Sequence, residues 1–383
     1  MDLNNRGGQW IRQQSNYKAF IPKKLPPDPP LMIDDKMIRL LSDADRKLGR
    51  LDGLTQVLPN PELFVAMYVQ KEAVLSSQIE GTQASLVDVL QIEQASGDKR
   101  LDIEEVVNYV KAVNWGMARI EALPLSLRLI REIHEVLLDG VRGANKEPGE
   151  FRRSQNWIGP AGCTLTDASF VPPPPSEMNI ALSDLEKYLH EDCPLPKLIQ
   201  IALIHAQFET IHPFLDGNGR IGRLLITFWL FQQRILNYPL LYISYYFKKH
   251  RMEYYDRLNN VRMYGQWEEW VQFFLKAIAE TADSATNCGR EIVLLKDHLA
   301  KEIQESLKGK GNGIKMLDYL FQHPIIRIND IKSYLSISYP TSKSLVDSFC
   351  EMRILEPINK QRSRNKTYQF SQYVKLLSEG TEL

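Results

Sequence analysis

The sequence predicts a mainly α-helical protein built around a short polar stretch between two helices. Apolar residues recur with a helical period in residues 198–208 and again in residues 224–231. Residues 212–223 lie between them and contain a histidine, a carboxylate, two glycines that flank an asparagine, and two arginines. We therefore expect a helix–loop–helix junction whose helices are anchored in a core and whose loop carries the chemistry.

The composition is that of an ordinary globular protein. The 383 residues are 44% hydrophobic and 25% charged, with a formal net charge of 0, which gives no bulk basic field for nucleic acid. The four cysteines show no C-x-x-C spacing and indicate reduced thiols. The sequence shows no signal-peptide pattern and no apolar run long enough to span a bilayer. We expect a cytoplasmic protein of two or three domains without a membrane partner.

The junction has the features of an anion site. Gly217 and Gly219 allow the loop amides to turn inward, as in an anion-binding nest. Arg220 and Arg223 open the second helix, where the helix dipole disfavours cations. A bound phosphate would resolve this conflict, because a helix N-terminus binds anions readily. Further amide donors would come from Ile221 and Gly222.

Two other side chains of the junction point to catalysis. Asp216 beside a phosphate site suggests Mg²⁺, which takes a carboxylate together with phosphate oxygens. Pro213 ends the first helix at His212, whose pKa suits it to accept a proton near neutral pH. These residue types predict a nucleotide-phosphate site with a metal ion and a general base. The alternative, a glycine-rich loop with a capping aspartate and solvated arginines, explains any three of these features but not all of them at this spacing.

The same stretch resembles the Fic motif, H-P-F-x-D-G-N-G-R-x-x-R, and matches it at every specified position. The resemblance implies a Fic (Fido) family protein adenylyltransferase with a helical bundle and a small β-hairpin flap. Such an enzyme transfers AMP from ATP to a Tyr, Thr or Ser hydroxyl of a target protein, or of itself, and releases pyrophosphate.

The resemblance also implies a role for each position of the motif. His212 would deprotonate the target hydroxyl, and Asp216 would hold Mg²⁺ against the α- and β-phosphates. Arg220 would contact phosphates near the reacting centre, and Arg223 would hold the γ-phosphate and so orient the α-phosphorus. The phosphates would be cradled by Gly217, Asn218 and Gly219.

An earlier helix, predicted from Pro61 to Ile79, ends in a second short motif. Glu80 in a last helical turn is disfavoured by the dipole, so it is either solvated or paired with a cation elsewhere. Ser76, Glu80 and Gly81 resemble the Fic inhibitory motif [S/T]-x-x-x-E-[G/N]. The resemblance implies that Glu80 pairs with Arg223 and occupies the γ-phosphate space, so that ATP binds only in a non-productive pose.

Two further segments flank the predicted site. The Gly- and Pro-rich residues 143–175 predict a β-hairpin and a linker. It is either a plain surface hairpin or, by the resemblance, a flap on which the target docks as an added strand. Tyr254 and Tyr255 follow the motif at the distance where Fic proteins line the adenine pocket, although aromatic clusters are commonly core.

A different site is conceivable on the helix that enters the motif. His205, Glu209 and His212 fall at i, i+4 and i+7 on one face, a set that could bind a transition metal. No H-E-x-x-H order and no fourth ligand accompany them. We instead expect His205 and Glu209 to support the loop or the neighbouring helices.

The two ends of the chain complete the predicted organisation. Residues 1–100 are expected to hold an extended arm with little regular structure and then the inhibitory helix, and residues 101–307 the Fic core. Residues 308–383 begin with a linker, 308–313, and then resemble a winged helix of three helices and a basic hairpin. Its recognition helix would begin Thr341-Ser342-Lys343-Ser344, and its wing would carry Lys360, Arg362, Arg364 and Lys366.

The winged helix leaves alternatives for the function. It could contact DNA phosphates, or it could serve protein interaction and a homodimer, since some Fic relatives of this layout self-associate. One alternative is thus a transcription regulator or interaction protein whose Fic core only senses nucleotide. Another is a Fic relative that removes AMP or transfers another phosphate-linked group. The complete motif with Arg223 favours AMP transfer from ATP, restrained by Glu80.

Overall fold

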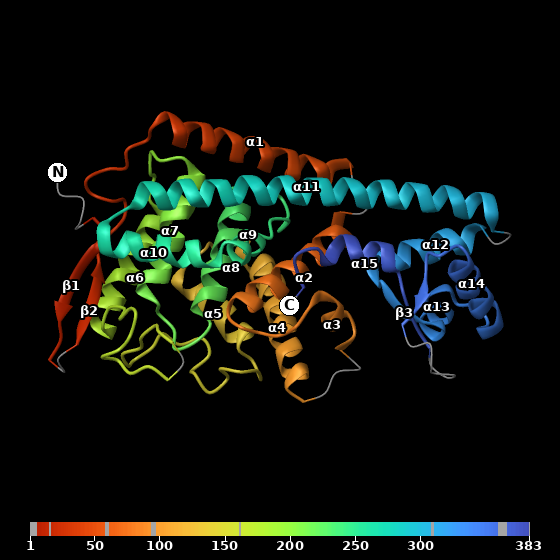
Figure 1. Ribbon diagram of the computed structural model, residues 1–383, viewed down its shortest axis with the longest axis horizontal. Helices are drawn as coiled ribbons and strands as arrows, with labels where there is room; N and C mark the ends of the chain where they lie inside the picture. Colours follow the sequence, from red (N-terminus) through yellow and green to blue (C-terminus); the bar gives the residue numbers. More distant parts are fainter. Residues whose placement is uncertain are drawn as a thin grey trace.

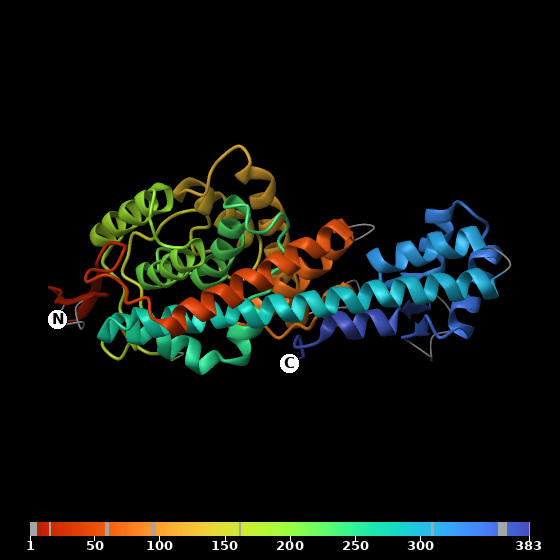
Figure 2. The ribbon, with the colours of Figure 1, turned by 90° about the horizontal axis from the view of Figure 1, so that it is seen from above.

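The computed structural model describes residues 6–14, 17–57, 61–92, 97–160, 162–307, 310–358 and 366–382. One long helix, α11 (Trp267–Ser306), runs through most of the molecule (Figure 1). Helix α1 (Asp35–Val57) lies along it, and the second view shows the far end of α11 entering the C-terminal domain (Figure 2). The mainly helical fold predicted from the sequence is confirmed.

The other helices of the body pack on one side of α11. Among the described residues, no helix is both long and apolar enough to cross a membrane. Besides α1 and α11, the helices of the body are α2 (Pro61–Ile79), α3 (Leu86–Leu90), α4 (Asp98–Ile120), α5 (Leu127–Leu137), α6 (Pro175–His190), α7 (Lys197–Ile211), α8 (Asn218–Gln232), α9 (Ser244–Lys249) and α10 (Arg251–Tyr264).

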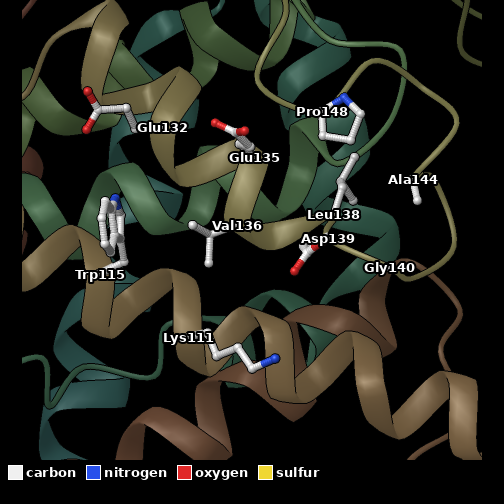
Figure 3. Close-up of a pocket in the computed structure, with 10 residues that line it drawn as sticks. All are labelled: Lys111, Trp115, Glu132, Glu135, Val136, Leu138, Asp139, Gly140, Ala144 and Pro148. Atoms are coloured by element: carbon white, nitrogen blue, oxygen red, sulfur yellow. The ribbon is translucent and has the colours of Figure 1, made fainter.

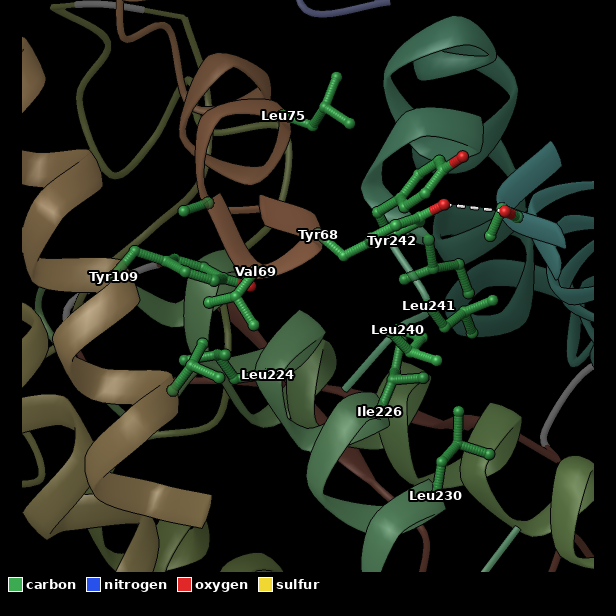
Figure 4. Packing of buried hydrophobic residues seen from close by; sticks show 14 of the residues in the cluster. Tyr68, Val69, Leu75, Tyr109, Leu224, Ile226, Leu230, Leu240, Leu241 and Tyr242 are labelled. Carbon is green, nitrogen blue, oxygen red and sulfur yellow. Dashed lines mark hydrogen bonds between the residues drawn. The ribbon is translucent and has the colours of Figure 1, made fainter. Parts of the chain in front are cut away.

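Helices α7 and α8 form the predicted junction and lie in the centre of the core. Every residue of α7 from Leu198 to Ile211 is buried, so this helix is enclosed on all sides, including its polar residues His205 and Glu209. The core also joins α8 to α2, because Leu224 of α8 lies near Val69 of α2 (Figure 4). The catalytic and inhibitory motifs predicted from the sequence are therefore carried by helices that share one core.

The N-terminal arm is more regular than predicted. Strands β1 (Gly8–Arg12) and β2 (Lys18–Pro22) form an antiparallel hairpin. The ring of Trp10 lies 5.3 Å from that of Phe20 and 5.8 Å from that of Phe170, and the Phe20 amide donates to the Val171 carbonyl. The expectation of little regular structure was wrong, because cross-strand aromatic packing stabilises a hairpin that glycine and proline content alone disfavours.

The expected flap hairpin is reduced to one antiparallel bridge between Ile158 and Phe170. Prolines at positions 172–175 follow the second arm of the bridge, and proline cannot donate to a strand ladder. The segment is therefore mostly irregular, and its Ala161 lies outside the described residues.

The C-terminal domain begins without the expected linker in its described part. Residues 310–313 already belong to α12, and a Cβ on Gly313 would lie 2.7 Å from Ile303, so the glycine allows close packing on α11. Three short strands form a sheet in the order β3-β5-β4. The elements are α12 (Lys310–Gln322), β3 (Ile325–Arg327), α13 (Ile328–Leu335), α14 (Tyr339–Glu351), β4 (Glu356–Pro357), β5 (Thr367–Gln369) and α15 (Ser371–Ser378).

The winged-helix assignment stays a prediction. The wing residues Lys360, Arg362 and Arg364 lie outside the described residues, whereas Lys366 precedes β5. At the start of α14, Ser342 is buried and its predicted partners in the recognition helix are exposed.

Candidate active site

His212 ends α7 in a strained conformation that the surroundings maintain. Its φ of 50° and ψ of 61° are left-handed, which is uncommon for a residue with a Cβ and requires support from neighbours. Its amide donates to the Phe208 carbonyl at 2.9 Å. Its carbonyl accepts from Arg152 Nε at 2.9 Å and from Asn156 Nδ2 at 3.3 Å. The direction of the imidazole is thus fixed through its backbone.

Arg152 is the main support of this backbone. It is 1% exposed, and its guanidinium also donates to the carbonyls of Ser154, Pro173 and Ile211. Burial lowers the pKa of Arg152 to about 10, so the side chain remains charged at neutral pH. A buried cation bonded to several carbonyls holds the loop firmly, because the buried Pro173 and Ile211 would otherwise lose the side-chain donor to their carbonyls.

Two further side chains fix the rest of the loop. Asn218 bonds both main-chain groups of Phe214, accepting from the amide and donating to the carbonyl, each at 2.8 Å. His134 bonds the Asp216 carbonyl through Nε2 at 3.0 Å, while its Nδ1 accepts from the Gly149 amide. His134 must then carry its proton on Nε2, and burial lowers its pKa to about 4. Asn218 therefore has a structural role in the loop, in addition to the phosphate contact that the resemblance implies.

The imidazole of His212 is kept neutral. Burial and the charges of Arg262 and Arg152 lower the pKa of His212 to about 3. Its Nδ1 is buried and has no hydrogen bond among the described residues. The sequence predicts a pKa near neutral pH for this histidine. The lower pKa keeps the imidazole in the neutral form that can accept a proton, but it makes His212 a weaker base than expected.

The start of α8 combines positive and negative groups. Gly217 is its N-cap in a left-handed conformation, with φ 78°. Asp216 Oδ1 accepts from the Gly217 amide at 2.6 Å and from Arg220 Nη2 at 3.3 Å. Glu105 lies 3.6 Å from Arg220, so two carboxylates already compensate the cation at the positive end of the helix. Nε and Nη1 of Arg220 remain buried without a hydrogen bond among the described residues and could donate to a phosphate.

Glu80 and Arg223 meet, as the resemblance implied. Arg223 Nη2 donates to Glu80 Oε1 at 2.8 Å and to the Ser76 carbonyl at 2.9 Å, and its Nε donates to Ser76 Oγ at 2.8 Å. Burial alone would raise the pKa of Glu80, but the neighbouring charges of Arg223 and Arg220 outweigh it and lower the pKa. Glu80 is therefore an anion held against the first turn of α8.

The Glu80 carboxylate lies close to the glycine-rich first turn of α8. A Cβ built on Gly219 would lie 2.3 Å from Glu80 Oε1. Glu80 thus covers the glycine-rich start of α8, while its side chain remains 33% exposed. Gly81, with φ 100°, follows the end of the helix at this point, in a conformation that favours glycine.

The transition-metal alternative finds no support. His205 donates from Nδ1 to the Gly222 carbonyl at 2.8 Å and accepts at Nε2 from the Tyr254 hydroxyl at 2.9 Å, so both ring nitrogens are engaged. In the described part of the chain, no three His, Cys, Asp or Glu side chains form a group that could hold a metal ion. Glu209 is buried against Gly222, which agrees with a supporting position.

The two tyrosines proposed for the adenine pocket lie in different surroundings. Tyr254 is 1% exposed and its ring stacks on Phe247 with centroids 4.5 Å apart. Tyr255 is 41% exposed. Tyr254 therefore occupies the core position that the sequence left open as its alternative, and Tyr255 is the one able to reach a ligand.

A groove between α4 and α5 lies beside this site. Trp115 and Lys111 of α4 face Val136 of α5 and Asp139 across it (Figure 3). None of the site residues predicted from the sequence lines it.

Sequence reasoning missed the supports of the loop. Arg152 and Asn156 lie in the Gly- and Pro-rich segment, some sixty residues before the loop that they hold. Glu105 and His134 lie on the apolar faces of α4 and α5. The usable signal was the polar run around Arg152 in a segment with little regular structure, where a buried arginine has unpaired carbonyls to bind.

Comparison with known proteins identifies the domains. The model described as "Fic/DOC family N-terminal" matches residues 38–118, which include α2 and the turn that carries Glu80. The model described as "Fic/DOC family" matches residues 124–230, which include α7, the loop and most of α8.

Curated relatives carry the name "Protein adenylyltransferase Fic". The protein from Drosophila virilis is 28% identical over 262 residues, covering 61% of this chain and 50% of the relative. The protein from Culex quinquefasciatus is 30% identical over 256 residues, covering 62% and 47%. The chain thus spans about half the length of the curated relatives it matches.

Solved structures show the same fold. A Fic family protein from Desulfovibrio desulfuricans matches with a TM-score of 0.59 at 21% identity, over 89% of this chain and 97% of that chain. A Fic domain containing signaling protein from Bacteroides thetaiotaomicron matches with a TM-score of 0.51 at 21% identity, over 67% and 95%. With both family models matched and both motifs in place, this chain belongs to the Fic/DOC family.

Proposed function

We propose that this protein transfers AMP from ATP to a Tyr, Thr or Ser hydroxyl of a target protein, with release of pyrophosphate, and that Glu80 restrains the reaction. The observation that carries the proposal is the ion pair of Arg223 with Glu80, at 2.8 Å, beside the glycine-rich start of α8. Without Glu80, Arg223 would be free to bind a phosphate. We call this restraint of Arg223 by Glu80 the brake. The names of the relatives support AMP as the transferred group.

The chemical step needs a base and an in-line arrangement. The hydroxyl oxygen of the target attacks the α-phosphorus, the bond from that phosphorus to the bridging oxygen breaks, and pyrophosphate leaves with the electron pair. The proton of the hydroxyl passes to His212, which is neutral because its pKa is about 3. Arg220 and the first amides of α8 stabilise charge on the phosphates.

Mg²⁺ fits the donors that the site offers. Asp216 is a carboxylate with 35% of its side chain exposed, next to the proposed phosphate position, and oxygen ligands of this kind suit Mg²⁺. Mg²⁺ would neutralise phosphate charge there. Asp216 is the residue that would hold it.

Inhibition follows from competition for one cation. In this arrangement Glu80 supplies Arg223 with the negative charge that a γ-phosphate would bring. ATP whose γ-phosphate cannot reach Arg223 is left with its α-phosphorus misaligned for attack. Displacement of Glu80 is therefore required before transfer.

The test is intact mass after incubation with ATP and Mg²⁺. We expect an adduct of one AMP on the Glu80→Gly protein, or on an added hydroxyl-bearing target, and little on the wild type. The Glu80→Gly, His212→Ala double variant is the control and should show no adduct while still binding ATP. ATP binding without an adduct in any of the three proteins would contradict AMP transfer and favour a nucleotide sensor.

A second function is proposed for the C-terminal domain. Its β3 lies between α12 and α13, its β4 and β5 follow α14, and the three strands pair in the order β3-β5-β4. We infer that it is a winged helix that binds a partner through α14, where Thr341, Lys343 and Ser344 are exposed. DNA contact predicts binding of a duplex that weakens with salt. Absence of such binding together with capture of a protein would favour the interaction module.

A further inference from the structure

The last turn of α2 is held on two sides. Ser76 and Glu80 face Arg223. Gln78, two residues from each, lies on the other side of the helix. Its Nε2 donates to the carbonyls of Ala84 and Thr381, both at 2.9 Å. The far side of the inhibitory turn is thus bonded to a residue that follows it by 303 positions.

Lys248 of α9 completes this contact. Its Nζ donates to Gln78 Oε1 at 2.7 Å, to the Glu382 carbonyl at 2.7 Å and to the Gly380 carbonyl at 3.3 Å. One ammonium group therefore joins the inhibitory helix to two carbonyls of the C-terminal segment. We call Gly380–Glu382, with Gln78 and Lys248, the tail brace.

The segment Gly380–Glu382 fits its place closely. Thr381 is 1% exposed, and both its amide and its hydroxyl bond the Ser378 carbonyl. Gly380 has φ 80°, and a Cβ there would lie 2.2 Å from the ring of Tyr245. Only glycine suits both the conformation and the space. The segment is therefore closely packed in a specific position.

The tail brace also connects two parts of the molecule. Helix α15 leads out of the C-terminal domain and lies against α2 and α3 (Figures 1 and 2). Its Tyr373 and Leu377 are buried. A displacement of the C-terminal domain that moved α15 would reach the inhibitory turn through the carbonyls bonded to Gln78 and Lys248.

We propose that the tail brace holds Glu80 in its inhibitory position and that release of Gly380–Glu382 relieves the inhibition. The proposal rests on the proposed braking role of Glu80. Glu80 itself is partly exposed and bonded through one oxygen, so its position depends on how firmly the turn beneath it is held. A partner that binds the C-terminal domain would then have a route to the active site.

The test uses two variants of the full chain and a matched control. Lys248→Met removes the ammonium, and Gly380→Ala displaces the tail through Tyr245. Lys249→Met, at the exposed neighbouring lysine, is the control. We expect both brace variants to raise AMP transfer about 3- to 10-fold and the control to leave it unchanged, as befits a modest shift between two states. In the Glu80→Gly background the same changes should add nothing.

Amide hydrogen exchange measures how readily the turn opens, independently of activity. The amides of Glu80, Gly81 and Thr82 bond carbonyls of residues 77–78, and they should exchange faster in both brace variants. Unchanged exchange in both would overturn the tail brace, as would an equal rise of activity in the Glu80→Gly background. Absence of transfer in every protein would instead contradict the proposed function, while the exchange data would still decide on the brace.

Discussion

The catalytic loop and the inhibitory turn both surround the start of α8, yet they are held in different ways. In the loop, the carbonyls of His212, Phe214 and Asp216 accept bonds from side chains of other segments. In the turn, the Glu80 carboxylate makes one ion pair and is 33% exposed. The loop is fixed through its main chain, whereas the Glu80 carboxylate is fixed by one side-chain contact, although further bonds hold the turn that carries it.

This difference matches two requirements of the proposed reaction. The base must keep its position, and the inhibitory carboxylate must be displaced. A general base has to stay within hydrogen-bond reach of its substrate, and small displacements cost much of its effect. The inhibitory carboxylate has to yield to a competing anion. Arg223 is buried and needs a negative partner, whereas Glu80 is 33% exposed, so a phosphate that replaces the carboxylate keeps the buried cation paired. We infer that the geometry of His212 is built in and that occupancy of Arg223 is the adjustable quantity.

The strongest test of this contrast removes the base. His212→Ala in the Glu80→Gly background should lower the rate of AMP transfer by about 10²- to 10⁴-fold, the range for loss of a general base. ATP affinity should stay nearly constant, because the phosphates are held by Arg220, Arg223 and the amides of α8. Intact mass against time measures the first and calorimetry the second. A loss of ATP binding as large as the loss of rate would mean that His212 mainly holds nucleotide.

The next test removes the support instead of the base. Arg152→Met leaves several buried carbonyls without their donor and should cost about 3–5 kcal/mol of stability, together with much of the activity. Arg153→Met is the matched control. The Arg153 side chain is 81% exposed, and its ion pair with Glu150 is long, at 3.9 Å. Thermal unfolding compares the two variants. Equal small effects at both positions would show that the loop does not depend on Arg152.

A third test concerns the brake alone. Glu80→Gly should raise the transfer rate by about 5- to 150-fold, the range of a coupling free energy of 1–3 kcal/mol. Glu80→Gln keeps the shape but removes the charge, so it should give a smaller rise. An equally low rate in both variants and the wild type would show that pairing with Arg223 does not limit transfer.

The sequence predicted the parts of this site that are local and missed those that are distant. His212, Asp216 and Arg223 belong to one continuous motif, and Ser76, Glu80 and Gly81 to another. The meeting of these motifs across 143 positions was available only through resemblance to a family. No period or spacing would have predicted it.

The residues that support the loop, such as Arg152, belong to no sequence motif. Arg152 acts through main-chain carbonyls, which every residue carries, so its partners leave no trace in the sequence. The aromatic residues show the same limit, because Tyr254 lies in the core and Tyr255 at the surface although the two are adjacent. Which of them a helix buries depends on what packs against it.

The smallest expected effect is that of pH on the base. Burial and the charges of Arg262 and Arg152 place the pKa of His212 at about 3, so the neutral form persists from pH 8 to pH 5. The turnover rate of the Glu80→Gly protein at saturating ATP should change less than about twofold over this range. An ordinary histidine with a pKa of about 6.5 would lose roughly 30-fold at pH 5.

Stability limits the range in which this can be measured. His134 and His205 are also buried in the neutral form, with pKa values lowered to about 4 and about 3 by burial. In the unfolded chain they bind protons below about pH 6.5, so the stability that is present above that pH is lost as pH falls toward the folded values. Circular dichroism at each pH separates unfolding from titration of the base. A fall in rate with a midpoint near pH 6.5 in protein that remains folded would show that His212 is solvated in the active state. The arrangement around Arg152 would then have to open whenever the brake is released.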